Sequence, residues 1–113
     1  MSAYRLLYLT VPDRESGRAL ARRMVEEKLA ACAHLFPAGE SFYLWDGKLM
    51  AEAEHIVIAK TTADLASTAI DRIAEWHAYD IPCVLSLPIE GGYGPFLKWI
   101  DDETGRDSSL RSE

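Results

Sequence analysis

Cys32 and His34 are the residues whose types and spacing come nearest to part of a metal site. They lie two residues apart in a stretch typical of a β-strand, so both side chains point to the same face. Thiolate sulfur and imidazole nitrogen suit copper and zinc. Two donors are too few for a stable site, so an oligomer axis or a second element carrying His77 must complete it. Alternatively, Cys32 is a small buried apolar residue and His34 a packed polar one.

A catalytic role for the same pair is disfavoured. Cβ atoms two apart on a strand are too distant for an easy hydrogen bond between thiol and imidazole, and no third group is evident to orient the base. The spacings of zinc-binding Cys-x-x-Cys and His-Glu-x-x-His motifs and of EF-hand loops are absent. We therefore expect a protein that is not an enzyme.

Glu52 and Glu54 form a second candidate pair on one strand face. Paired carboxylates can transfer protons or bind hard cations. They can equally be a solvated strand edge whose charges prevent aggregation, which is the reading we favour. His55 points to the opposite face and is expected in a core or an interface.

Aromatic side chains are dense in two places. Tyr43 and Trp45 alternate on one strand face, and His77 and Tyr79 follow a predicted helix. Such side chains line ligand clefts or subunit interfaces, and an interface is favoured here. Lys60 ends a long strand just before a helix start, where it could meet an anion or simply reach solvent.

The elements that position these residues follow a β-α-β-β-α-β order with a late helix. Asp13 can cap the first helix, Thr62 can start the second, and Pro95 suits the first turn of the third. Pro88 places the last strand at an edge, or ends it. The predicted strands cover 4–12, 31–37 with a break before 42–45, 48 to about 60, and 83–89.

This order predicts an α+β ferredoxin-like fold, with one antiparallel sheet and two helices on one face. Asp46-Gly47 predicts a two-residue hairpin turn. The strand that follows is about twice the usual length, so part of the hairpin overhangs the sheet. Pairing with another copy around residues 42–54 would satisfy the exposed backbone, which predicts a homo-oligomer.

The composition sets further limits. The chain has 113 residues and 12.6 kDa, which predicts one domain over 1–104 and a polar tail over 105–113. Twelve basic and 18 acidic residues give a net charge of −6, which disfavours nucleic acid and anionic lipid as partners. We expect no membrane span and no secretory leader. Two cysteines are too few for a disulfide framework, so a cytoplasmic location is expected.

Six further segments are informative by their order and spacing, although none of them is specific alone. They are Glu27-Lys28-Leu29-Ala30-Ala31-Cys32, Tyr43-Leu44-Trp45-Asp46-Gly47-Lys48, Lys60-Thr61, His77-Ala78-Tyr79-Asp80-Ile81-Pro82, Leu87-Pro88-Ile89 and Phe96-Leu97-Lys98-Trp99-Ile100. Through these segments the chain resembles the CutA family of divalent-cation tolerance proteins over residues 6–100. Three positions depart from the family pattern: His34 stands in place of asparagine, Ala78 in place of proline and Cys83 in place of glutamate.

The resemblance implies a tight homotrimer, similar in architecture to PII signalling proteins, in which long hairpins pair between subunits. It also implies copper or another divalent metal ion as ligand, without an organic cofactor. Loss of the usual glutamate at Cys83 puts a carboxylate-dependent role of the cleft in doubt, and the added thiol and imidazole favour softer metals.

Together these arguments predict a function and three sets of candidate residues. The favoured function is that of a metal-tolerance trimer, and the alternative is a PII-like module that binds a small anion or metabolite between subunits. The metal donors are Cys32, His34, His77 and Cys83; the ligand cleft is Trp45, Lys60 and Tyr79; the trimer interface is Tyr43, Trp45, Lys48, Glu52 and Glu54.

Overall fold

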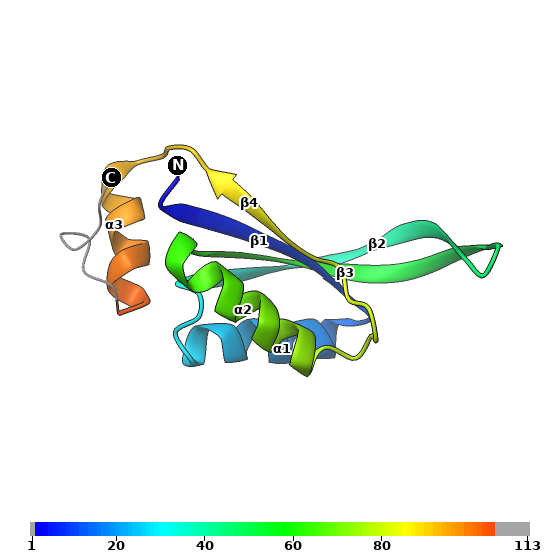
Figure 1. Cartoon of the computed structure of the whole chain (residues 1–113). Helices are drawn as coiled ribbons and strands as arrows, with labels where there is room; N and C mark the ends of the chain where they lie inside the picture. Colours follow the sequence, from blue (N-terminus) through cyan, green and yellow to red (C-terminus); the bar gives the residue numbers. More distant parts are fainter. Residues whose placement is uncertain (1, 106–113) are drawn as a thin grey trace.

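A computed structural model describes residues 2–105 of the chain as four strands and three helices (Figure 1). The polar tail expected over 105–113 lies, apart from Gly105, outside the described residues. In chain order the elements are β1 (Tyr4–Val11), α1 (Arg14–Glu26), β2 (Cys32–Trp45), β3 (Lys48–Thr62), α2 (Ala63–Trp76), β4 (Val84–Ile89) and α3 (Gly94–Glu103).

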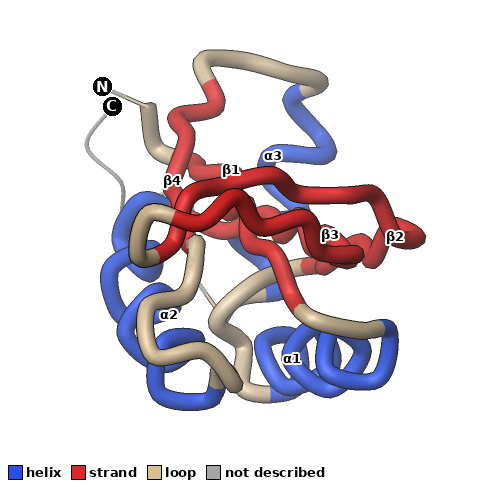
Figure 2. The backbone as a smooth tube through the Cα atoms, turned by 90° about the vertical axis from the view of Figure 1, so that its right-hand side faces the viewer, coloured by secondary structure: helices blue, strands red, loops and turns tan. Residues whose placement is uncertain are grey.

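The strands form one antiparallel sheet in the order β2-β3-β1-β4. Helices α1 and α2 lie side by side on one face of this sheet, and α3 lies at the end where β1 begins (Figures 1 and 2). This is the predicted ferredoxin-like arrangement with its additional helix. Because β2 and β4 are the edge strands, Pro88 does lie at an edge, where its missing N–H interrupts no inner ladder.

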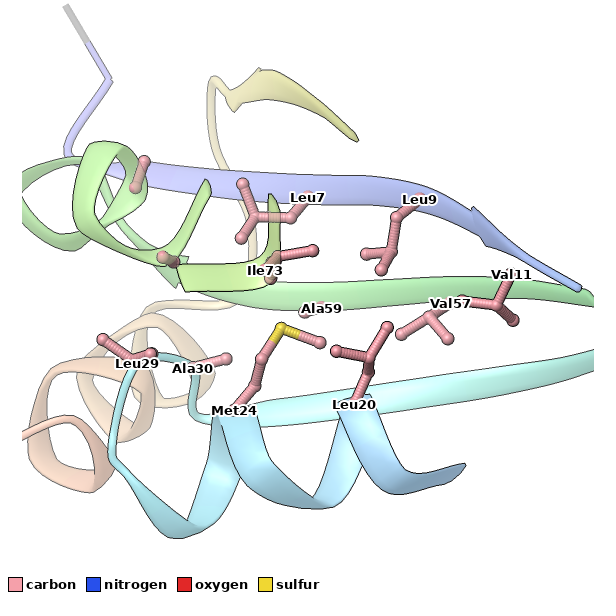
Figure 3. Close-up of a cluster of buried hydrophobic side chains, with 12 residues drawn as sticks. Leu7, Leu9, Val11, Leu20, Met24, Leu29, Ala30, Val57, Ala59 and Ile73 are labelled. Carbon is pink, nitrogen blue, oxygen red and sulfur yellow. The ribbon is translucent and has the colours of Figure 1, made fainter. Parts of the chain in front are cut away.

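The core lies between the sheet and the two helices (Figure 3). Leu7, Leu9 and Val11 alternate along β1 and are fully buried, as a strand with one covered face requires. Met24 of α1 and Ile73 of α2 meet them from the helix layer and are also fully buried. Burying each such side chain stabilises the fold by about 1.5–3 kcal/mol.

The helix starts are those the sequence predicts. The Asp13 carboxylate accepts a hydrogen bond of 2.7 Å from the Ser16 amide, and the Thr62 hydroxyl accepts one of 3.3 Å from Leu65. The bond from Ser16 is the main reason that the pKa of the Asp13 carboxyl lies below its ordinary value. Pro95 lies in the first turn of α3, where it costs no intrahelical bond.

The β2–β3 hairpin turns at Asp46 and Gly47, whose φ angles are 51° and 76°. Two positive φ angles are what a type I′ turn requires, so this prediction is confirmed. The expected break between 37 and 42 is wrong as a strand boundary. β2 is continuous, and its pairing with β3 shifts register between Phe36 and Gly39 before it resumes. Pro37 supplies no N–H for the ladder at that point.

The hairpin extends well beyond the sheet. β1 pairs with β3 only as far as His55, so the part of β3 before it pairs with β2 alone. The molecule is therefore elongated, at 50 × 26 × 23 Å, and its Cα radius of gyration is 15.0 Å. A compact chain of this length would have a radius of gyration of about 13 Å. The predicted overhang is thus present.

Candidate functional site

The sheet face opposite α1 and α2, here called the open face, is rich in apolar side chains. Because alternate residues share a face, the burial of Leu7 and Leu9 on the helix side places Leu6 and Tyr8 on the open face. The pairing then places these further side chains beside them: Phe36, Ile56, Ile58, Leu85 and Leu87. Leu85 and Leu87 are 55% and 45% exposed, so the single chain leaves apolar surface uncovered.

Cys32 and His34 both point to one face of a strand, as predicted. The strand is β2, at an edge of the sheet, and the face is the open face. His34 is exposed and stacks on Phe36, with ring centroids 4.7 Å apart. Cys32 is half-buried and pairs in register with Lys60. The two donors therefore share a face with the uncovered apolar surface.

Cys83 lies near the opposite edge of the sheet. Its carbonyl accepts a bond from the amide of Thr10, at the approach to β4. Three inter-strand steps separate β2 from β4, which puts Cys32 and Cys83 roughly 14 Å or more apart. Both thiols are free. The structure therefore does not bring them together within one chain.

His77 is buried and both of its ring nitrogens are occupied. Nε2 lies 2.7 Å from the carbonyl oxygen of Thr10, and Nδ1 accepts a 3.1 Å bond from the backbone N–H of Tyr79. A neutral imidazole has one donor and one acceptor, and this geometry uses both. In the single chain His77 positions the segment after α2 and offers no lone pair to a metal. Within residues 2–105, no group of three or more His, Cys, Asp or Glu side chains could hold a metal ion.

A cavity of about 510 Å³ lies between the hairpin overhang and the segment that leads into β4. Its hairpin wall is made of alternate residues on the open-face side of β2 and β3, and Thr10 lies at its base. The opposite wall is the 79–83 segment. The lining residues are Thr10, Tyr43, Trp45, Met50, Glu52, Glu54, Tyr79, Asp80, Ile81 and Cys83.

Two phenols hold two carboxylates in this cavity. The Tyr79 hydroxyl donates a 2.9 Å hydrogen bond to Glu54, which joins the two walls, and the Tyr43 hydroxyl donates to Glu52 within the hairpin. Burial, and then the bond to Glu54, raises the pKa of Tyr79 far above its ordinary value. The bond to Glu52 raises the pKa of Tyr43. Both phenols therefore stay neutral donors at physiological pH.

Residues from all three predicted sets line this one cavity. Trp45 and Tyr79 come from the predicted ligand cleft, and Tyr43, Glu52 and Glu54 come from the predicted trimer interface. Cys83, a predicted metal donor, also lines it. Lys60 and Lys48 do not line it, and the register puts Lys60 beside Cys32 and Leu6 at the far end of the sheet.

Sequence reasoning missed several lining residues: Thr10, Met50, Asp80 and Ile81. Met50 could have been found, because it alternates with Glu52 and Glu54 on one strand face. The other three come from segments that meet the hairpin only in the fold. Among residues 2–105, no helix is long and apolar enough to span a bilayer.

The fold and the site define the class: a small α+β ferredoxin-like protein with a long hairpin, an open apolar sheet face and an aromatic, acidic cavity. Solved structures share this architecture. CutA from Xylella fastidiosa superposes with a TM-score of 0.89 at 33% identity, over 91% of this chain and 99% of that one. CutA1 from Oryza sativa superposes with a TM-score of 0.88 at 38% identity, over 90% and 94%.

The sequence pattern described as CutA1 divalent ion tolerance protein matches residues 5–103. The divalent-cation tolerance protein CutA of Archaeoglobus fulgidus is 38% identical over 99 residues, which cover 88% of this chain and 96% of the relative. Chloroplastic CutA of Arabidopsis thaliana is 41% identical, over 88% of this chain and 54% of its own length. This chain thus spans about half of that plant relative. The chain belongs to the CutA family of divalent-cation tolerance proteins.

Proposed function

We propose that the chain acts as a homotrimer that binds copper or another divalent metal ion and contributes to metal tolerance. The observation that carries this proposal is the position of Cys32 and His34 on the open apolar face. Apolar surface exposed in one chain favours association, because covering it removes it from water. Association through that face would bring copies of the two donors toward one another.

The trimer is supported by two separate features of the chain. The open face leaves Leu85 and Leu87 uncovered, and the hairpin overhang carries exposed apolar side chains at Phe42, Leu44 and Leu49. Tyr43 and Trp45 are also exposed and lie on the opposite face of the overhang, so apolar side chains are uncovered on both of its faces. Pairing between the hairpins of neighbouring copies would cover these side chains. This supports the proposed interface of Tyr43, Trp45, Lys48, Glu52 and Glu54.

A soft-metal site is supported by the donor types. Each chain supplies one thiol and one imidazole, so three chains would supply six donors where one supplies two. Cys83 could contribute from a neighbouring copy, whereas His77 is committed to its backbone partners. The two free thiols also support the proposal that the protein works in a reducing cytoplasm.

The second candidate is a PII-like trimeric module, not an enzyme, that binds a small metabolite between subunits. The observation in its favour is the cavity that joins Trp45 and Tyr79. Three carboxylates line this cavity, and Lys60 lies elsewhere, so an anionic ligand is poorly suited to it.

A competitive copper and zinc titration, with the molar mass measured in the same sample, tests the first proposal. The Cys32→Ser, His34→Ala double variant should lose saturable binding at a fixed ratio per trimer. Cys83→Ser is made separately, because its thiol, at the opposite edge of the sheet, could supply a ligand from a neighbouring copy. Ser67→Ala, on the exposed side of α2, is the control, because it removes none of the proposed metal donors. Weak, unsaturable binding that the double variant leaves unchanged would reject the metal site and make the second candidate the better account.

A further inference from the structure

We propose that the cavity between the hairpin and the 79–83 segment binds an organic ammonium ion. This inference rests on the second candidate function, in which the trimer leaves the cavity open to a ligand between subunits. It does not rest on the first candidate, in which neighbouring hairpins cover Tyr43, Trp45, Glu52 and Glu54, and it leaves the Cys32 and His34 donors uninvolved. The cavity volume, about 510 Å³, falls within the range of small-molecule sites, about 300–1,000 Å³.

Aromatic rings supply the first part of the argument. Tyr43 and Trp45 project from β2 and Tyr79 from the facing wall, so π systems flank the space from both sides. Ring faces attract a cation placed within about 6 Å of the ring centroid, and tryptophan does so most strongly. Met50 and Ile81 add apolar surface that would contact methyl or methylene groups around the nitrogen.

Charge supplies the second part. Glu52, Glu54 and Asp80 line the cavity, and none of its described lining residues is basic. Each phenol bonds one carboxylate oxygen: Oε1 of Glu52 and Oε2 of Glu54. The other oxygen of each carboxylate can then face a cation. The bond that joins Tyr79 to Glu54 also holds the two walls in place before a ligand arrives, which lowers the ordering cost of binding.

The geometry distinguishes this ligand from a bare metal ion. A hard cation needs several oxygen ligands at 2.0–2.6 Å, and within residues 2–105 no three acidic, cysteine or histidine side chains converge closely enough to hold one. Carboxylates spread around an aromatic cavity suit a larger cation whose charge is shared over an alkylated nitrogen. An anion would meet three lining carboxylates and no lining basic side chain, since Lys48, the cross-strand partner of Trp45, is not among the lining residues.

Choline serves as the probe, and 3,3-dimethylbutan-1-ol is its uncharged analogue of the same shape. The chain has three tryptophans, Trp45, Trp76 and Trp99, whose indole N–H signals can be followed separately by NMR. We expect choline to shift the Trp45 signal saturably in a sample of verified molar mass, while Trp76 and Trp99 act as internal references. The neutral alcohol should bind at least about tenfold more weakly.

Substitutions locate the site. Glu54→Gln removes one charge with little change in shape and should weaken choline binding by roughly three- to tenfold. Trp45→Leu removes an aromatic ring and should weaken choline binding by a similar factor. Because this variant lacks the Trp45 signal, its binding is measured from the ring signals of Tyr43 and Tyr79. Glu40→Gln is the matched control, because Glu40 lies on the same hairpin but outside the cavity. Melting points of all three variants show that they remain folded.

Several outcomes overturn the proposal. The first is that choline binds no more tightly than its neutral analogue. The second is that Glu54→Gln weakens binding no more than Glu40→Gln does. The third is that a verified trimer gives no saturable Trp45 shift. The last result would indicate that a neighbouring copy fills the cavity. These failures are separate from those of the proposed function: a trimer that binds copper but not choline loses only this inference, and a monomer that binds choline loses only the trimer.

Discussion

His77 shows how one side chain can serve the site without touching a ligand. It is 8% exposed and links the Thr10 carbonyl of β1 to the backbone N–H of Tyr79. His77→Ala would leave both backbone groups without this partner, at a cost of about 1–3 kcal/mol each. We expect the free energy of unfolding to fall by about 2–4 kcal/mol in urea denaturation at fixed protein concentration.

The control for this prediction is His34→Ala. His34 is exposed and stacks on Phe36, so its loss should cost roughly 1 kcal/mol or less. Equal losses for the two variants would show that the buried hydrogen bonds of His77 contribute little. If a folded His77→Ala variant lost copper binding, that result would instead support His77 as a metal ligand.

Gly17 decides how closely α1 approaches the sheet. A Cβ atom at this position would lie 2.7 Å from Cδ1 of Leu35 and 2.9 Å from Cγ2 of Val11. Leu35 ends in a flexible group, but Val11 is β-branched and fully buried, so it cannot move away cheaply. Alanine would otherwise stabilise the helix by about 1 kcal/mol relative to glycine.

We therefore expect Gly17→Ala to destabilise the protein by about 1 kcal/mol net, because overpacking of a dense core costs about 1–3 kcal/mol. Thermal denaturation measures the change. Ala19→Gly is the comparison at an exposed position of the same helix, where only helix propensity acts. If Gly17→Ala raised the melting point, α1 would have room to shift.

At the scale of elements, the sequence predicts most of the fold because its signals are local. The Asp13 and Thr62 caps, the Asp46-Gly47 turn and Pro95 each act within a few residues, and the structure confirms all of them. The break expected near Pro37 fails because a lost N–H interrupts a ladder locally without ending the strand. β2 remains one strand because it pairs with β3 on both sides of the irregularity.

The site was less predictable, because its parts meet only through tertiary structure. Periodicity correctly placed Tyr43 with Trp45, and Glu52 with Glu54, each pair on one face of its strand. The register of the hairpin then shows that the two pairs share a face. It could not show that Tyr79 would reach across to Glu54, 25 residues away in sequence. Nor could it show that Lys60, on the same face of β3 as Glu54, lies six residues further along the strand and far from the cavity.

At the scale of the whole molecule, the open face predicts assembly. Ile58 lies near the centre of that face, between His34 on β2 and Tyr8 on β1. A charge there would be buried without a partner in the proposed trimer but could reach water in one chain. Light scattering at micromolar concentration should therefore give about three times 12.6 kDa for the native chain and 12.6 kDa for Ile58→Arg. The melting point of the native chain should also rise with protein concentration. Ser67→Arg, on the exposed side of α2, should keep the trimer mass. A native mass of 12.6 kDa, or an Ile58→Arg variant that stays trimeric, would mean that this face is not the interface.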